Sequence, residues 1–469
     1  MKPITITNKE IPVTGEYDVL VAGGGLGGIA AALSAARNGA KTAILEKNNY
    51  LGGVATSGMC SSVFNCLKTE SGNIAIDGIP LEIVDALALR AGGPGTSWKK
   101  HRGHIIYDIE QAKLLFSEIL EEAGVTQLLG MTVCDVLSEN GKVCGIIAAG
   151  RNGLEAIRAK NVVDSTGDST VAFLAGAEVE YALNGQSYVF RIGGVDMDKF
   201  IGYFKEHPDE YPSKIDVNWD LEDALKQYDE NGTFLFPHGG GFHNTIVKKA
   251  IEDGLLQTEF LSHSHVCAMQ MHGIRDKGVL HVITGFTNLE SLGSEHITKA
   301  IIDGRKMSNH VINFFRERMP GFEKAYLSQG ADDLGIRNSR RVKTQFVFTK
   351  EMRETPSRFD DCIGCGVVEK HVILHAEKGA WQAQILADEM YQIPLRTLLP
   401  QQISGVIMGT GRSLTPILRV MVTTMLIGQA AGAAAAVASK ENLPVEAIDV
   451  KKVQEALEKQ GVSLNRDKK

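Results

Sequence analysis

The sequence predicts an α/β protein in which a parallel sheet with an attached β-meander is built from both ends of the chain and an α+β domain is inserted between them. Three observations predict it. An apolar strand, a glycine turn and a helix of small residues follow one another near the start. Strands with hairpin turns come next, and a strand, a glycine turn and an apolar helix return near the end. The middle of the chain, residues 185–385, differs in composition, with more His, Lys, aromatic residues and Pro.

The first element is a complete βαβ unit. A strand at 17–22 runs into the glycine turn at 23–28, and Gly39 ends the helix that follows. A second strand at 41–45 ends on Glu46. This is G-x-G-x-x-G in its required context, with an acidic residue about 20 positions on.

Each residue of this unit has a physical role. Gly23 permits the tight turn, Gly25 allows close approach of a pyrophosphate, and Gly28 allows the helix to pack on the strand. The N–H groups and dipole at the helix start attract phosphates. Glu46 is suited to accept hydrogen bonds from ribose hydroxyls, and its charge disfavours a 2′-phosphate. The unit therefore predicts an adenine dinucleotide with an unmodified ribose.

The next elements alternate between strand and turn patterns. Residues 111–123 have helical periodicity, and 161–164 read as a strand that ends in a tight turn, with Asp168 placed to cap the next helix. Between them the hairpin turns separate three predicted strands at 132–137, 143–149 and 155–159.

Near its end the chain again has a strand pattern followed by a glycine turn, with the strand at 405–408 and the turn at 409–412. The segment 420–439 carries no charge and contains Gly428-x-x-x-Gly432, so its length and motif are compatible with a membrane span. Its composition is mostly small residues, which suits a helix buried inside a protein. We therefore expect an interior helix.

The composition is typical of a globular cytoplasmic protein, with a net charge of −7 and 43% hydrophobic residues. The N-terminal residues lack the apolar core of a signal peptide, and seven cysteines form a sparse, odd set that argues against a secreted disulfide framework. No basic stripe suggests nucleic acid. We expect a small-molecule substrate, with neither a nucleic-acid nor a membrane partner, and leave homo-oligomerisation open.

Four blocks make the likeness to a known family specific. They are GGGLGGIAAALSAARNGAKTAILEKNNYLGGVATSGM, NVVDSTGDSTVAFLAGAEVE, YQIPLRTLLP with GVIMGTGRS, and LRVMVTTMLIGQAAGAAAAVA. With them the chain resembles the FAD-dependent oxidoreductase family that has a glutathione-reductase-type flavin domain and is related to fumarate reductase flavoproteins. The resemblance implies a Rossmann-like FAD-binding domain formed by 1–184 and 386–469, and an inserted substrate or cap domain at 185–385.

The resemblance also implies where an extended FAD would lie. The pyrophosphate would sit on the first glycine turn, the adenosine ribose at Glu46, and the ribityl chain by Gly411 and Arg412. The start of the C-terminal helix would face the flavin pyrimidine end, where a helix N-terminus stabilises the negative charge of the reduced ring. The implied contacts are Gly23, Gly25, Leu26, Gly28, Glu46, Lys47, Gly52, Gly53, Ala55, Thr56, Ser57, Val133, Thr166, Gly167, Asp168, Gly411, Arg412, Val420, Met421 and Val422.

The chain departs from the family pattern in two places. The link between Arg412 and Arg419 is short, where the family usually has a longer loop that often carries a His near the flavin. The common Arg-Glu-Ser-Arg cluster appears here as residues 337–341, RNSRR, with Asn in place of Glu.

Four residues are candidates for the chemistry. His375 matches the family position near the active site and is a candidate acid, base or substrate contact, with a hydrogen-bonded structural histidine as the alternative. Arg341 and Arg419 are candidate anchors for a carboxylate, with interdomain salt bridging as the alternative. Cys60 follows the segment expected to pass the flavin and is a candidate to face the ring.

Other motifs leave alternatives open or are excluded. Cys362-x-x-Cys365 near a flavin suggests a redox-active pair. The alternative is that both residues are inert buried thiols. Glycines at 239–241 after His238 imitate an esterase segment, but the chain has no G-x-S-x-G, so hydrolase chemistry is excluded. Histidines 263 and 265 have metal-like spacing without further ligands, so no metal is expected.

The sequence therefore predicts an FAD-dependent oxidoreductase that transfers a hydride between a small organic substrate and flavin N5. The alternatives are reduction of a C=C bond, as in fumarate reductase, and an FAD-bound scaffold subunit of a larger assembly. The chain shows no second G-x-G-x-x-G module for NAD(P)H, so we expect electrons to pass to oxygen, a quinone or a partner protein, or a reaction that is internally redox-neutral.

Overall fold

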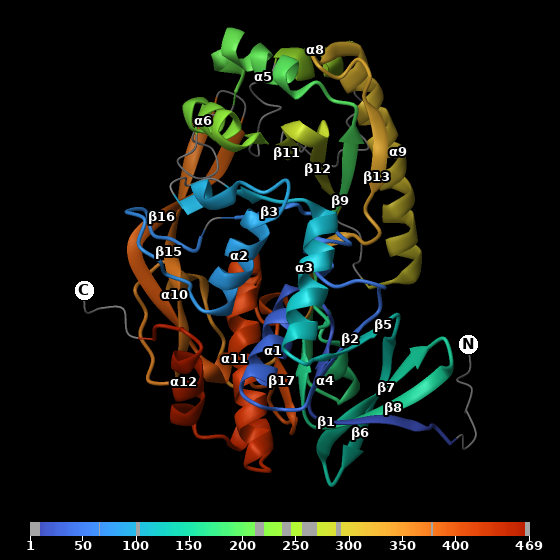
Figure 1. Ribbon diagram of the computed structural model, residues 1–469, viewed down its shortest axis with the longest axis vertical. Coiled ribbons are helices and arrows are strands. Elements are labelled where there is room, and N and C mark those ends of the chain that lie inside the picture. Colours follow the sequence, from blue (N-terminus) through green and yellow to red (C-terminus); the bar gives the residue numbers. More distant parts are fainter. Residues whose placement is uncertain are drawn as a thin grey trace.

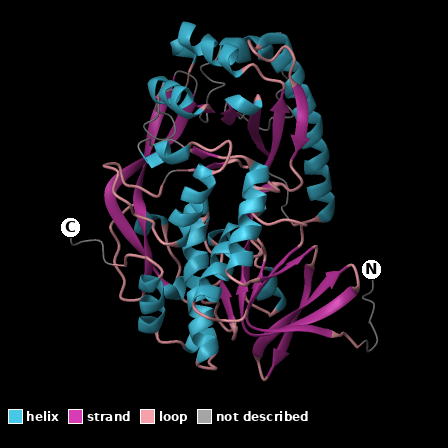
Figure 2. Cartoon of the chain, in the orientation of Figure 1, coloured by secondary structure: helices cyan, strands magenta, loops and turns pink. Residues whose placement is uncertain are grey.

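A computed structural model describes residues 10–64, 66–99, 104–211, 220–236, 245–255, 270–287, 292–376 and 379–464. Figure 1 shows two stacked halves. The half near both termini contains the first sheet and the helices α1 (Leu26–Arg37) and α11 (Met421–Lys440), and the other half contains a second sheet bordered by the long helix α9 (Ser294–Arg318). Figure 2 shows the strands of both sheets and a separate two-stranded hairpin.

The first sheet has the predicted architecture. Its strands follow the order β5-β2-β1-β8-β7-β6, with β17 also paired to β8. The pairs around β1, β2, β5, β8 and β17 are parallel, whereas β6, β7 and β8 form the antiparallel meander. This confirms the predicted fold class. The bounds are β1 Val13–Ala22, β2 Thr42–Glu46, β5 Thr126–Leu129, β6 Thr132–Glu139, β7 Lys142–Gly150, β8 Gly153–Asp164 and β17 Val406–Met408.

One strand is longer than the sequence suggests. The predicted strands at 155–159 and 161–164 are a single strand, β8, which pairs with β7 along its first half and with β1 over most of its length. The polar Asn161 does not interrupt it, because its side chain donates to Ser439 Oγ at 3.0 Å and accepts from the Val445 N–H at 2.9 Å.

The helices α1 (Leu26–Arg37) and α11 (Met421–Lys440) pack tightly against each other. A Cβ placed on Gly428 would lie 2.0 Å from the Gly27 carbonyl oxygen, and one on Gly432 would lie 2.1 Å from that of Ala31. Helix α11 is long and apolar enough to cross a membrane, but 83% of its apolar window is buried inside the protein. The G-x-x-x-G motif is therefore a contact surface for α1, as expected for an interior helix.

The second sheet is antiparallel and follows the order β10-β11-β12-β9-β13, with β14 also paired to β9. Its own apolar core includes Phe200, Phe234 and Phe315. Strand β9 runs through residue 185, the predicted start of the inserted domain, and the division into two domains stays a prediction. The bounds are β9 Val179–Gly193, β10 Thr233–Phe236, β11 Gln270–Ile274, β12 Val279–Thr287, β13 Tyr326–Gly330, β14 Gly335–Val342, α5 Met197–Glu206, α6 Leu221–Asn231, α8 Thr245–Glu252 and α9 Ser294–Arg318.

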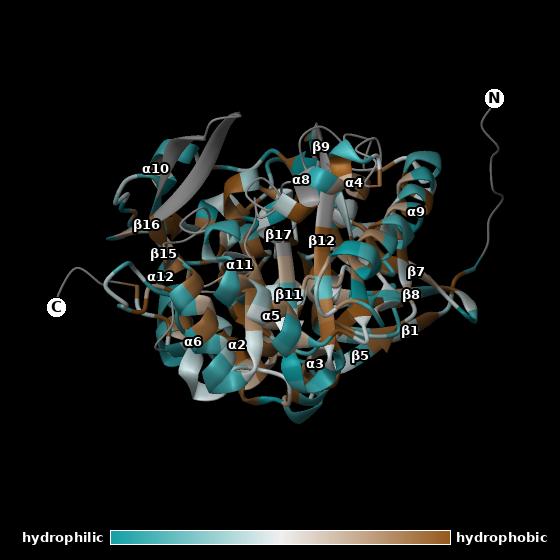
Figure 3. Ribbon diagram, turned by 90° about the horizontal axis from the view of Figure 1, so that it is seen from above, coloured by the Kyte–Doolittle hydropathy of each residue, from teal (hydrophilic) through white to brown (hydrophobic). Residues whose placement is uncertain are grey.

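The hairpin of β15 (Cys362–Ala376) and β16 (Gly379–Pro394) lies on the opposite side of the molecule from α9 (Figure 3). Its base joins the core of α1 and α11 through Ile363, Tyr391 and Ile393. The remaining elements cover the same half or join the two: α2 Ile79–Leu89, β3 Ser62–Val63, β4 Ile105–Ile106, α3 Ile109–Glu122, α4 Thr170–Leu174, α10 Lys350–Arg353 and α12 Val450–Lys459.

Candidate active site

The glycine turn between β1 and α1 has the shape that phosphate binding requires. Gly23 has φ +101°, and a Cβ there would lie 2.4 Å from the Ser165 carbonyl oxygen. A Cβ on Gly28 would lie 1.9 Å from the Gly23 oxygen. A Cβ on Gly25, in contrast, would meet no atom of the described chain within 4 Å. Backbone is therefore exposed to open space at Gly25, where a phosphate can approach it.

The start of α1 offers unused donors beside this space. The first bond of the helix ladder runs from the Ile29 N–H to the Gly25 carbonyl at 2.9 Å, which leaves the N–H groups of Leu26, Gly27 and Gly28 outside the ladder. Gly25 gives the helix no side-chain cap, and its first turn contains no acidic residue. Donors, dipole and free space thus fit the pyrophosphate of a dinucleotide.

Glu46 lies at the end of β2, buried beside the same turn. Its Oε2 accepts from the Gly24 N–H at 2.7 Å and its Oε1 from the Asn48 N–H at 2.9 Å. Burial raises the pKa of Glu46, and these two N–H groups oppose the shift. A carboxylate has about four acceptor positions, so two remain for ribose hydroxyls. The Met131 N–H donates to the Glu46 carbonyl at 3.0 Å, which brings the start of β6, and with it Val133, toward Glu46.

The segment after β2 offers backbone rather than side chains. Gly52 has φ +117°, and its N–H donates to the Gly24 carbonyl at 2.8 Å. The hydroxyl of Thr56 donates to the Leu51 carbonyl at 2.7 Å, and that of Ser57 to the Gly53 carbonyl at 2.8 Å. Both hydroxyls are thus engaged within the segment, which also holds the buried Ala55.

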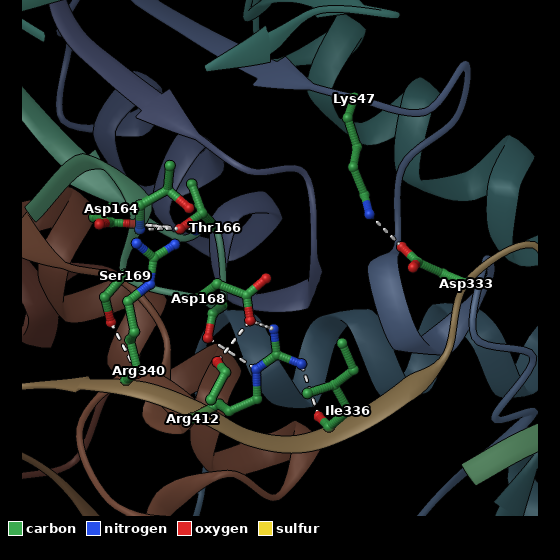
Figure 4. Close-up of polar contacts among 12 residues, drawn as sticks. Lys47, Asp164, Thr166, Asp168, Ser169, Asp333, Ile336, Arg340 and Arg412 are labelled. Atoms are coloured by element: carbon green, nitrogen blue, oxygen red, sulfur yellow. Dashed lines mark hydrogen bonds and ion pairs between the residues drawn. The ribbon is translucent and has the colours of Figure 1, made fainter. Parts of the chain in front are cut away.

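The loop between β13 and β14 closes over this segment. The N–H groups of Asp332 and Asp333 donate to the Ser57 carbonyl at 3.0 and 3.1 Å. Lys47 forms an ion pair with Asp333 at 2.6 Å, which Figure 4 shows apart from the cluster around Arg412. Lys47 therefore links the two halves of the protein.

Arg412 joins three segments at the carboxyl end of the first sheet (Figure 4). Its Nε donates to the Gly167 carbonyl at 2.9 Å, its Nη1 to the Ile336 carbonyl at 2.7 Å, and its Nη2 to Asp168 Oδ1 at 2.9 Å. The same Asp168 oxygen accepts from Ser339 Oγ at 2.6 Å. Arg412 and Gly411 begin a turn of their own. Through Arg412 this turn is connected to the turn after β8 and to β14.

The expectation that Asp168 caps α4 is wrong. Its carboxylate is bound to Arg412 and Ser339, and the N-cap residue is Ser169, whose hydroxyl donates to the Arg340 carbonyl and not to the helix. Thr166 Oγ1 accepts from the Thr170 N–H at 2.9 Å in its place. A charged partner competes successfully with a helix N-terminus for a carboxylate.

The start of α11 is the second helix N-terminus at this edge of the sheet. Its first ladder bond joins the Thr424 N–H to the Val420 carbonyl at 2.8 Å, so the N–H groups of Met421 and Val422 lie outside the ladder. Val420 provides no side-chain cap, and the first turn carries no acidic residue. The N-terminus of α11 thus remains available for negative charge, as α1 does.

Arg419 strengthens the positive charge in front of α11. Burial lowers its pKa to about 9, with further repulsion from Arg337, Arg353 and Arg412, and only Glu369 acts in the opposite direction. Glu369 already pairs with Arg353 at 3.3 Å, and both side chains are buried. Basic groups therefore outnumber acidic ones around Arg419.

The other candidates for the chemistry lie in different surroundings. Burial raises the pKa of Cys60 to about 11, although Arg337 and a hydrogen bond to the Ser62 backbone oppose the shift, so Cys60 is a thiol at neutral pH. Arg341 donates to Asn338 Oδ1 at 3.2 Å. His375 lies in β15, and its side chain falls outside the described part of the chain. Catalytic roles for these residues stay predictions.

Cys362 and Cys365 are free thiols buried beneath the end of the chain. Both sulfurs lie within 3.9 Å of the Leu464 carbonyl oxygen, and their mutual contact raises the pKa of Cys362. Within the described ranges no cluster of three or more His, Cys, Asp or Glu side chains is arranged for a metal. His238 and histidines 263 and 265 lie outside those ranges.

Sequence reasoning missed a buried polar cluster between the two sheets. It contains Ser61, Ser62, His104, His272 and His281, which come from three distant parts of the chain. No local pattern marks them, because the pairing of β11 with β12 and the packing of β11 on β3 bring them together.

Three comparisons place the chain among known proteins. It is 30% identical over 156 residues to dihydrolipoyl dehydrogenase of Acholeplasma laidlawii, covering 33% of this chain and 42% of that protein. It is 32% identical over 175 residues to digeranylgeranylglycerophospholipid reductase of Methanocella arvoryzae, covering 34% and 42%. The match thus spans less than half the length of either curated relative. A geranylgeranyl bacteriochlorophyll reductase-like structure from Thermoplasma acidophilum aligns at 15% identity and a TM-score of 0.45, covering 96% and 84%.

A family model described as FAD dependent oxidoreductase matches residues 18–457, which is most of the chain. The glycine turn, Glu46 and the uncapped start of α11 are compatible with that cofactor. The chain belongs to the FAD dependent oxidoreductase family, and FAD is its cofactor.

Proposed function

We propose that this protein oxidises or reduces a small organic substrate by hydride transfer, with FAD bound along the edge of the first sheet. One observation carries the proposal. Two uncapped helix N-termini, those of α1 and α11, lie at the carboxyl ends of parallel strands, and the two helices pack directly on each other. One N-terminus suits the pyrophosphate and the other suits the pyrimidine end of a flavin.

The chain supplies binding and charge. The first turn of α1 would hold the phosphates, and Glu46 would accept the ribose hydroxyls with its two unused acceptor positions. Bound FAD supplies the hydride acceptor or donor at N5. Arg419 and the N-terminus of α11 would stabilise negative charge next to it. Because Arg412 is engaged by Gly167, Ile336 and Asp168, we assign it a positioning role.

The charge around Arg419 supports a substrate that carries a carboxylate or another anionic group. Arg419 is half-buried beside Arg337, Arg353 and Arg412, with Glu369 as the opposing acid. A buried excess of positive charge is costly, and an anionic ligand would relieve it. Arg337 is also among the groups that influence the Cys60 thiol, which follows the segment proposed to pass the flavin.

The direction of hydride transfer and the closer relationship to fumarate reductase flavoproteins belong to this proposal as well. Reduction of a C=C bond is the reverse form of the same chemistry, and an anionic enoate would suit the same arginines. The electron acceptor is proposed to be oxygen, a quinone or a partner protein.

An anaerobic screen tests the function. To test substrate oxidation, purified protein containing FAD is mixed with hydroxy acids, amino acids and sugars, and bleaching of the oxidised flavin bands is recorded. To test substrate reduction, photoreduced protein is mixed with enoates, and return of the oxidised bands is recorded. We expect a carboxylate-bearing compound to react, and Arg419→Gln to weaken its binding by about tenfold or more. Arg316→Gln, on the exposed side of α9, is the matched control. A flavin that photoreduces normally but responds to no metabolite would favour the scaffold alternative.

A further inference from the structure

A row of polar residues crosses three strands of the second sheet. His272 in β11 pairs with His281 in β12, and His281 pairs with Arg191 in β9. Both histidines are fully buried. The His272 backbone acts on the His281 ring as a hydrogen-bonding neighbour, and Arg191 Nε is buried without a partner among the described residues. Unpaired buried polar atoms are rare, so this row has unused capacity for a water molecule.

His272 connects the row to the strand that follows the proposed flavin segment. Its Nδ1 lies 3.3 Å from Ser61 Oγ and its Nε2 lies 2.9 Å from Ser62 Oγ. The Ser62 hydroxyl also lies 3.1 Å from Nδ1 of His104. All four side chains are buried. Ser61, His272, Ser62 and His104 thus form a continuous hydrogen-bonded chain that begins one residue after Cys60.

Because the Ser62 hydroxyl bridges His104 and His272, the hydrogen bonds of this chain can be arranged in two ways. A hydroxyl has one hydrogen to donate, so Ser62 can donate to one imidazole while it accepts from the other. If protonated His104 donates to Ser62 Oγ, the hydroxyl proton can pass to His272 Nε2. His104 is then neutral, Ser62 is again a hydroxyl, and His272 carries the charge. One proton has moved between the two histidines, and every atom has its full set of bonds.

We propose that Ser61, His272, Ser62 and His104 form a proton relay serving the active site. The inference rests on the proposed function: when a substrate loses a hydride to bound FAD, the proton of its O–H or N–H group must also leave, and the relay takes it up. In the reverse direction the relay returns the proton. Histidine suits this task because its ordinary pKa lies near neutral pH.

Charged groups from three elements act on His281, the neighbour of His272 in the sheet. Arg191 approaches from β9, and Asp108 at the start of α3 pairs with Lys277 in the β11–β12 turn at 2.6 Å. Burial and Arg191 lower the pKa of His281 to about 3, with Asp108 opposing and Lys277 adding to the shift. His281 is therefore neutral at physiological pH.

The first test needs no substrate. The holoprotein is photoreduced with EDTA as electron donor in weakly buffered solution, and a pH indicator records the protons taken up per flavin between pH 6 and 8. We expect His272→Gln to take up fewer protons per flavin than the wild type, because the substitution removes one basic group of the relay. His310→Gln, on α9, should match the wild type. Equal uptake in wild type and His272→Gln would overturn the proposal.

The second test uses a substrate from the anaerobic screen. Ser62→Ala should slow flavin reduction by about a hundredfold, with an increased solvent deuterium isotope effect and an unchanged apparent substrate affinity. Ser62→Thr keeps the hydroxyl and should restore most of the rate, whereas Ser308→Ala, a buried serine of α9, should match the wild type. Equal loss in Ser62→Ala and Ser62→Thr would mean that the hydroxyl is structural. A screen without any substrate defeats the proposed function, while the photoreduction test still judges the relay.

Discussion

The contact between α1 and α11 predicts that Gly→Ala at position 428 destabilises the protein, whereas the same substitution at an open helix position stabilises it. In a helix interior, Gly→Ala normally stabilises by about 0.5–1 kcal/mol, because alanine restricts the unfolded chain. At Gly428, however, the new methyl group would lie 2.0 Å from the Gly27 carbonyl oxygen, more than 1 Å inside ordinary contact. The opposing atom is backbone at the cofactor turn, so the helices must separate, and overpacking of this kind costs about 1–3 kcal/mol.

We therefore expect Gly428→Ala to lose up to about 2 kcal/mol of stability after the gain in helix propensity is subtracted. Gly202 in α5 is the matched control, because a Cβ there meets no described atom within 4 Å and Gly202→Ala should be stabilising. Urea unfolding followed by circular dichroism gives the midpoints, and flavin fluorescence reports release of FAD. A Gly428→Ala protein as stable as Gly202→Ala, with FAD retained, would refute the reasoning.

Three further predictions concern single side chains. Arg412→Gln removes most of three hydrogen bonds and leaves the partly exposed Asp168 without its cation, so it should cost about 1–3 kcal/mol in thermal unfolding. Asp168→Asn in the same protein should recover part of the loss. Cys60, whose pKa burial raises to about 11, should react with iodoacetamide far more slowly at pH 7 than the exposed Cys134, as read by mass spectrometry of labelled peptides, and equal rates would contradict the assigned burial. Burial acts to raise the pKa of Asp108, but hydrogen bonds from Lys277 and the Gln111 N–H outweigh it and lower the pKa. The stabilisation that ionised Asp108 gives the folded protein is therefore present above about pH 4 and is lost as the pH falls through the folded-state pKa. Acid titrations of Asp108→Asn should show a smaller loss of stability below about pH 4 than the wild type.

The parts of the fold that could be predicted are those in which local pattern and tertiary role agree. The turn at Gly23, Gly25 and Gly28 needs glycine for reasons visible in the sequence, and the small residues of α11 indicated its burial. The meander was predicted for the same reason, since its turns carry Asn-Gly pairs. Glu46 could be proposed as a ligand group from its position at the end of β2.

The remaining features depend on contacts between distant segments. Asp168 looks like a helix cap until Arg412, more than two hundred residues later, takes its carboxylate. The strands predicted at 155–159 and 161–164 join into one strand because Ser439 and Val445 satisfy the Asn161 amide. The relay around His272 depends on strand pairing that no short pattern encodes.

The pairing of α1 with α11 also sets an order of events during synthesis. The glycine turn and α1 leave the ribosome long before α11, which covers Gly27 and Ala31. Until then the apolar face of α1 has no permanent cover, and the second N-terminus proposed to hold the flavin does not exist. The intervening sheet must fold first, and contacts over such separations form slowly. The proposed FAD site is thus complete only after α11 has been made and has packed on α1.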